Sequence, residues 1–157
     1  MAADPPPPNP SPAASPTPAT AAAPAATAAP LVLDTMVLTW LTDPRHPRPD
    51  WEAFVVGRTL VLTFVTVGEI LHGAKSWRKQ QQVDIESRIT SYPVIPGTIG
   101  VARQFAELRS KFFHQIGDDD LWIAACVLTY PSALELGTDD AGFTRIAAQF
   151  PLVAVKP

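Results

Sequence analysis

The chain has 157 residues, a length typical of one folded domain, and a formal net charge of −3 at pH 7. This charge provides no overall attraction to a nucleic acid, so a polyanion would have to be bound through a local basic patch or metal ions. The single cysteine, Cys126, excludes an internal disulfide and a cysteine-based metal site. Because it lies in an apolar run, we expect it to be a small core residue.

Residues 1–30 consist almost entirely of Ala, Pro, Ser and Thr, and Asp4 is their only charged side chain. Such a segment cannot bury enough apolar surface to offset the entropy lost on ordering. We therefore predict a disordered Ala/Pro-rich tail at 1–30, with a linker as the alternative, and one folded domain at 31–157. The chain lacks the basic start and unbroken apolar stretch of a secretory signal, and no later segment is long enough to span a membrane. These features predict a cytoplasmic protein.

In the folded part, short apolar runs alternate with amphipathic stretches. The strands that we expect are 31–33, 59–64, 133–137 and 152–155, with an extended piece at 92–96 whose prolines favour a sheet edge. The helices that we expect are 35–42, 51–56, 65–77, 78–91, 101–112, 121–128 and 141–149. This alternation predicts an α/β fold in which a small parallel sheet is flanked by helices on both faces. Ligands of such folds bind beyond the C-terminal ends of the strands.

Acidic residues recur at this edge of the expected sheet. Asp34 follows the first strand directly, and Asp140 lies three residues past the 133–137 strand. Glu69 is expected in the first turn of the helix after the second strand, and a row of acids, 118–120, stands just before the 121–128 helix. Because these places share one edge of a parallel sheet, the carboxylates are expected to converge.

Helix capping is the alternative explanation for each acid taken singly. Asp is a favoured N-cap, and Thr66 with Glu69 fits a capping box. Taken together, several acids at one edge would repel each other and raise the pKa of at least one, unless a cation binds there. Oxygen ligands select Mg²⁺ or Mn²⁺, whereas zinc is disfavoured because the three histidines are far apart in sequence. They are His46, His72 and His114.

Basic residues near these acids are candidate phosphate contacts, with a solvated helix face as the alternative. They are Arg45, Arg48, Lys75, Arg78, Lys79, Arg109 and Lys111. Trp77 could stack on a nucleobase, and core or interface packing is its alternative role.

Four segments, LVLDTMVL, FVTVGEILHGA, IGDDDLWIAA and TDDAGF, resemble in this order the signatures of PIN-domain ribonucleases, most of all the VapC-type toxin of VapBC toxin–antitoxin pairs. The resemblance extends from Leu31 to about Val155. It implies a PIN-like three-layer fold and a Mg²⁺-dependent endoribonuclease, with Mn²⁺ as a substitute, acting as the toxin of a type II toxin–antitoxin system. The implied partners are an RNA substrate, a cognate VapB-like antitoxin and a second copy of the chain.

The same resemblance implies the site residues. The catalytic and metal-binding acids would be Asp34, Glu69, Asp120 and Asp140. Asp119 stands where the family commonly has Asn, so it would be an additional ligand or a supporting group, and Thr138 would hydrogen-bond within the site.

One departure from the family pattern concerns Met36, which stands where Asn or Ser is common. It motivates an alternative function, a catalytically weak PIN-like module that binds RNA or protein. A third class, a phosphatase of the haloacid dehalogenase type, would need Asp-x-Asp after the first strand. The run Asp34-Thr35-Met36 argues against that mechanism.

Overall fold

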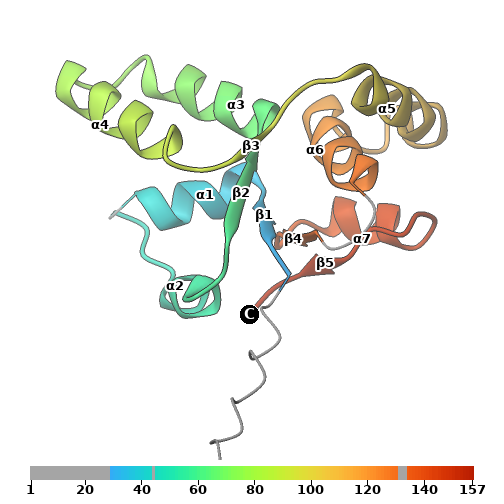
Figure 1. Ribbon diagram of the computed structural model, residues 1–157, viewed down its shortest axis with the longest axis horizontal. Helices are drawn as coiled ribbons and strands as arrows, with labels where there is room; N and C mark the ends of the chain where they lie inside the picture. The colour runs from blue at the N-terminus through green and yellow to red at the C-terminus, as the bar shows by residue number, and fades with distance from the viewer. Residues whose placement is uncertain (1–28, 44, 131–133) are drawn as a thin grey trace, which may run out of the picture.

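The computed structural model of the chain describes residues 29–43, 45–130 and 134–157. Its strands form a five-stranded parallel sheet of order β3-β2-β1-β4-β5 (Figure 1). The strands are β1 (Leu31–Leu33), β2 (Leu60–Thr63), β3 (Val94–Ile95), β4 (Glu135–Gly137) and β5 (Ala154–Val155). The predicted parallel sheet is confirmed, and the proline-flanked β3 lies at its edge. Residues 1–28 of the predicted tail, and Ala133 of the predicted fourth strand, lie outside the described residues.

Helices cover both faces of this sheet, which confirms the predicted three-layer α/β fold (Figure 1). They are α1 (Thr35–Thr42), α2 (Pro49–Val55), α3 (Phe64–Ala74), α4 (Lys79–Ile89), α5 (Ile99–Phe112), α6 (Asp118–Thr129) and α7 (Ala141–Ala147). Helices α1 to α4 gather on one side of the sheet, and α5 to α7 gather on the other. None of the helices in the described ranges is long and apolar enough to cross a lipid bilayer.

The apolar run of β1 is continuous because the strand is covered on both faces of the sheet. Leu31 and Leu33 face the core formed with α1 to α4, whereas Val32 faces the core formed with α5 to α7. Side chains alternate along a strand, so a strand covered on both faces is apolar at every position. Cys126 is buried in the second core, as predicted.

The start of β1 is tied to its neighbours. The Leu31 N–H donates to the Thr59 carbonyl over 2.8 Å. The Arg58 guanidinium donates to the Ala29 carbonyl over 3.0 Å and also pairs with Glu135 of β4. The chain therefore enters the sheet through a fixed point at the N-terminal edge, one strand length away from the edge where the acids follow.

The predictions for the start of α3 were wrong. Strand β2 passes into α3 without a loop, and Thr63 is the N-cap, since its hydroxyl accepts from the Thr66 N–H over 3.0 Å. Thr66 therefore lies inside the helix, and Glu69 lies in its second turn. Similarly, the acids at 118–120 form the first turn of α6 and do not precede it.

Candidate functional site

Two predicted site acids follow adjacent strands and cap the next helices. The Asp34 carboxylate accepts from the Val37 N–H at the start of α1 over 2.9 Å, and the Asp140 carboxylate accepts from the Gly142 N–H at the start of α7. The Asp34 N–H also donates to the Gly137 carbonyl over 3.2 Å, so the ends of β1 and β4 are directly joined. Both acids therefore lie at the C-terminal edge of the sheet, as expected.

Thr138 lies between these two acids. Its hydroxyl accepts from the Asp140 N–H over 3.0 Å, and the same side chain lies near the Asp34 carboxyl, whose pKa it lowers. Thr138 is itself buried. It thus fixes the loop between β4 and α7 against the end of β1.

The other two predicted acids come from helices. Glu69 of α3 accepts a hydrogen bond from the Thr35 hydroxyl, which joins α3 to the first residue of α1. Asp120 occupies the first turn of α6, where the helix dipole favours a negative charge. Gly117 is the N-cap of α6 and provides no side-chain cap.

The pKa of Asp120 shows that the acids act on one another. Burial raises this pKa, and the charges of Asp140, Asp34, Glu69 and Asp119 raise it further, to about 6. These four carboxylates come from separate parts of the chain, and they are near enough to disfavour ionisation of Asp120. The structure brings together the predicted acids, including the additional candidate Asp119.

The pKa of Asp34 is raised as well. The first cause is burial, since Asp34 is only 4% exposed. The charge of Asp140 raises the pKa further. Hydrogen bonds from Thr138 and from the N–H groups of Val37 and Met36 oppose this rise. Asp34 is thus held firmly by donors while remaining an unfavourable place for an isolated charge.

The donor chemistry of this cluster fits a divalent cation. Among the described residues, no Lys, Arg or His forms an ion pair with any of the four predicted acids. A hard cation would offset their mutual repulsion, and oxygen donors suit Mg²⁺ or Mn²⁺. In the same described ranges, no three Asp, Glu, His or Cys side chains are grouped closely enough to coordinate one ion. Closure of the carboxylates around an ion would therefore need side-chain rotation.

Two neighbouring acids are neutralised instead. Asp118 accepts from the Arg109 guanidinium over 3.0 Å. Asp139 accepts from the Arg48 guanidinium over 3.1 Å and from the Trp51 indole N–H over 3.4 Å. Asp139 could not be singled out from the sequence, because its partners lie about ninety residues earlier in the chain.

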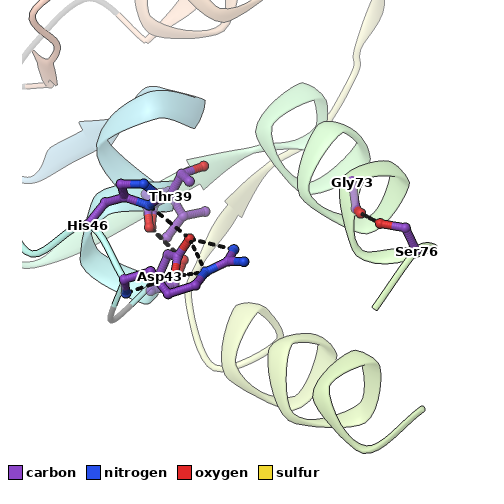
Figure 2. A network of polar contacts seen from close by, with 8 residues as sticks. Thr39, Asp43, His46, Gly73 and Ser76 are labelled. Atoms are coloured by element: carbon purple, nitrogen blue, oxygen red, sulfur yellow. Dashed lines mark hydrogen bonds and ion pairs between the residues drawn. The ribbon is translucent and has the colours of Figure 1, made fainter. Parts of the chain in front are cut away.

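The predicted basic contacts divide into two groups. In the loop after α1, Asp43 binds Arg45 over 2.7 Å and lies 3.3 Å from His46, a network shown in Figure 2. Lys75 and the pair Arg78 and Lys79 are exposed around the junction of α3 and α4. The loop cations are thus engaged by acids, whereas the α3–α4 cations face solvent.

Trp77 is half-buried and packs against the core formed with α1 to α4, which favours the packing role over base stacking. It also lines a pocket with Thr42 and Ile85, and none of the four predicted acids lines that pocket.

Comparison with known proteins agrees with this geometry. The family model of the PIN domain matches residues 31–149. FitAcB from Neisseria gonorrhoeae has a similar fold, with a TM-score of 0.66 and 23% identity over 81% of this chain and 97% of that one. No curated protein matches the sequence.

Two VapBC structures are similar to nearly the same degree. VapBC-1 from nontypeable Haemophilus influenzae has a TM-score of 0.64 and 24% identity, over 80% of this chain and 96% of that one. VapBC-5 from Mycobacterium tuberculosis is a member of the VapBC family of toxin–antitoxin systems. It has a TM-score of 0.64 and 23% identity, over 82% of this chain and 99% of that one. At these identities the likeness shows a shared fold.

Proposed function

Because this chain belongs to the PIN-domain family, a family of nucleases, we propose that it is a divalent-metal-dependent endoribonuclease and the toxin of a type II toxin–antitoxin pair. The observation that carries the proposal is the convergence of carboxylates from the ends of β1 and β4 and from α3 and α6. Burial first, and then the charges of the neighbouring carboxylates, raise the pKa of Asp120 to about 6. Acids whose environments disfavour their charge are characteristic of sites that bind cations or transfer protons.

In this proposal, Asp34, Glu69, Asp120 and Asp140 hold Mg²⁺, with Mn²⁺ as a substitute, and Asp119 offers a further oxygen. A divalent cation bound there lowers the pKa of water and offsets negative charge on a phosphate.

The chain's own contribution is positional. Thr138 connects the Asp140 backbone to the Asp34 carboxyl, and Thr35 orients the Glu69 carboxylate through its hydroxyl. These neutral partners fix three of the acids without cancelling their charge, which leaves the charge available to a cation. The rearrangement needed when a cation binds is then confined to rotation of the carboxylate side chains.

The proposed partners are an RNA substrate, a cognate VapB-like antitoxin and a second copy of the chain, in the cytoplasm. The shared fold with FitAcB and the VapBC structures supports a toxin–antitoxin role. The open α3–α4 cations, Lys75, Arg78 and Lys79, suit phosphate binding in spite of the net charge of −3.

The test is a Mg²⁺ titration of the metal-stripped full chain with a structured RNA. We expect cleavage that depends on Mg²⁺ or Mn²⁺ and is lost in Asp120→Asn. Asp118→Asn is the matched control. It also removes one carboxylate charge, two residues before Asp120, but Arg109 already neutralises that charge. Full cleavage by Asp120→Asn, with the chelator-treated parent equally active, would refute the proposal.

Met36 favours a second candidate, a PIN-like module without turnover. Its side chain is 41% exposed beside the Asp34 cap, so a polar group common at this place in the family is missing at an accessible position. This candidate predicts that the parent retains RNA on a native gel with Mg²⁺ and releases no cleavage product.

A further inference from the structure

A pair of exposed rings lies in the turn between α5 and α6. Phe113 is 52% exposed, and its ring centroid lies 3.8 Å from that of the His114 imidazole, with the two ring planes tilted by 47°. The Arg109 guanidinium lies over the same ring, 5.2 Å from its centroid. We name Arg109, Phe113 and His114 the stacking platform. Neither the hydrophobic cores nor the carboxylate cluster uses it.

The turn that carries the platform is held on both sides. Phe112 is only 2% exposed, and Ile116 packs against the core of α5 to α7. The Gln115 N–H donates to the Phe112 carbonyl over 2.9 Å, so the backbone turns tightly between these anchors. The exposed rings are therefore presented by a fixed turn, and their position does not have to be ordered when a ligand binds.

His114 has an unusual backbone conformation. Its φ of 61° is the only positive value at a non-glycine residue in the described ranges. The value fits the third residue of a type II turn over residues 112–115, with Phe113 at φ −51° and ψ 129° and the Gln115 N–H bound to the Phe112 carbonyl. Here the conformation places the imidazole beside the Phe113 ring.

The turn that carries the platform contacts the start of α7, the helix that Asp140 caps. Ile116 approaches to 3.7 Å the point where a Cβ on Gly142 would lie, and the Gly142 N–H binds the Asp140 carboxylate. The connection from Phe113 to Asp120 is seven residues long, which spans at most about 24 Å even when fully extended. A short polymer can therefore contact both places.

The charges around the platform favour a polyanion. Arg109, Lys111 and Arg145 are exposed, and Arg145 also donates to the Gln115 carbonyl over 3.5 Å. The acids nearest in the chain are Glu107 and Asp118. The ion pair of Asp118 with Arg109 is exposed on both sides, so it contributes little free energy and a phosphate can replace it.

We propose that the stacking platform binds an unpaired base of single-stranded RNA, with Lys111 and Arg145 contacting the adjacent phosphates. Every nucleobase has a π-face, so stacking on Phe113, with the His114 edge and the Arg109 guanidinium nearby, gives affinity with little sequence preference. This inference rests on the proposed function for its choice of ligand, and it identifies how the substrate would be gripped beside the carboxylates.

The test measures RNA binding in the absence of cleavage. The full chain carrying Asp120→Asn is titrated into labelled oligoadenylate of about twelve nucleotides, a length within the range of single-strand sites. An abasic ribose-phosphate chain of equal length is the second probe. Phe113→Ala and Phe113→Trp are compared in this background, with Tyr130→Ala as the control, since Tyr130 is an exposed aromatic at the other end of α6.

We expect Phe113→Ala to weaken oligoadenylate binding about 5- to 150-fold, the effect of losing one stacked base. Phe113→Trp should restore binding, Tyr130→Ala should leave it unchanged, and the abasic chain should bind the parent and Phe113→Ala equally.

The inference is overturned if the parent does not bind oligoadenylate, or if Phe113→Ala binds it as the parent does. It is also overturned if Phe113→Ala changes the sedimentation velocity of the protein, because the ring would then belong to a protein interface. Failure of the nuclease proposal gives a different pattern. RNA binding then still depends on Phe113, but the unsubstituted chain, which retains Asp120, does not cut RNA.

Discussion

Adjacent acids in this chain have opposite surroundings. Asp118 and Asp139 each have an arginine partner, whereas Asp120 and Asp140, in the same two segments, face other carboxylates. The residue type is the same in each case, and the difference arises from packing with distant parts of the chain. The fold thus neutralises the acids at the margin and leaves the central ones uncompensated, which is an arrangement suited to binding a cation.

Arg48 illustrates how a marginal acid is secured. Its guanidinium binds Asp50 over 2.8 Å and Asp139 over 3.1 Å, and it lies 4.1 Å from the centroid of a Trp40 ring. Trp51 adds its indole N–H to Asp139. These contacts hold the loop that carries Asp140, so a neutralised acid serves to place an uncompensated one.

The largest expected effect separates Asp140 from Asp139. Asp140→Asn should reduce RNA cleavage by about 10³-fold, because a metal-binding oxygen is worth several kcal/mol in such chemistry. Asp139→Asn should keep cleavage within about tenfold of the parent. Asn is also a good N-cap, so α7 should stay folded in the first variant, which circular dichroism can verify. Equal losses in both variants would break the distinction between marginal and central acids.

The next effect is on stability without metal. The pKa of Asp120 is raised from its ordinary 3.8 to about 6 by burial and by its acidic neighbours. Between these pH values the folded state binds more protons than the unfolded state, so stability falls as pH rises from about 4 to about 6. After allowance for solvent screening, we expect a loss of about 1 to 2 kcal/mol.

Asp120→Asn should therefore stabilise the metal-free protein at pH 7.5 and give no such gain at pH 4, as measured by urea unfolding. Asp118→Asn should change stability by less than about 0.5 kcal/mol at both pH values, because its charge is exposed and already paired. A flat pH dependence in the parent would contradict the proposed repulsion.

The smallest effect concerns the two arginines of the loop after α1. Arg48→Ala should lower the free energy of unfolding by about 1 kcal/mol, since it removes a partly buried ion pair and a cation–π contact. Arg45→Ala should change it by less than about 0.5 kcal/mol, because the Arg45 side chain is 72% exposed to solvent. Indistinguishable urea midpoints would show that the Asp139 network is not the stronger of the two.

The sequence predicts local features of this fold well. The apolar triplet Leu31–Leu33, the capping Asp34 and the proline after the helix were sufficient to place β1 and α1. Helix α2 begins at Pro49, earlier than the predicted 51, because proline suits a first helical turn whose N–H groups lack partners. Three of the four predicted site acids, Asp34, Asp120 and Asp140, could be chosen because each adjoins a strand end or a helix start, whereas Glu69 lies in the second turn of α3.

Contacts between distant segments could not be predicted. Nothing near Asp139 or Arg48 in the sequence indicates that they meet across 91 positions. The choice between Thr63 and Thr66 as the cap of α3 depends on where β2 ends, which is set by its pairing with β1 and β3. Likewise, Phe113 follows the apolar stripe of α5, and only the fold shows that its ring faces solvent.

The anchoring of Ala29 by Arg58 has a practical consequence. The chain enters the sheet at the N-terminal ends of its strands, whereas the acids lie beyond the C-terminal ends, so an attachment made upstream of Ala29 begins on the far side of β1. A biotin or affinity handle placed there could immobilise the protein on a sensor surface and leave the carboxylate edge accessible. Binding of RNA or an antitoxin could then be followed on molecules tethered away from the acids.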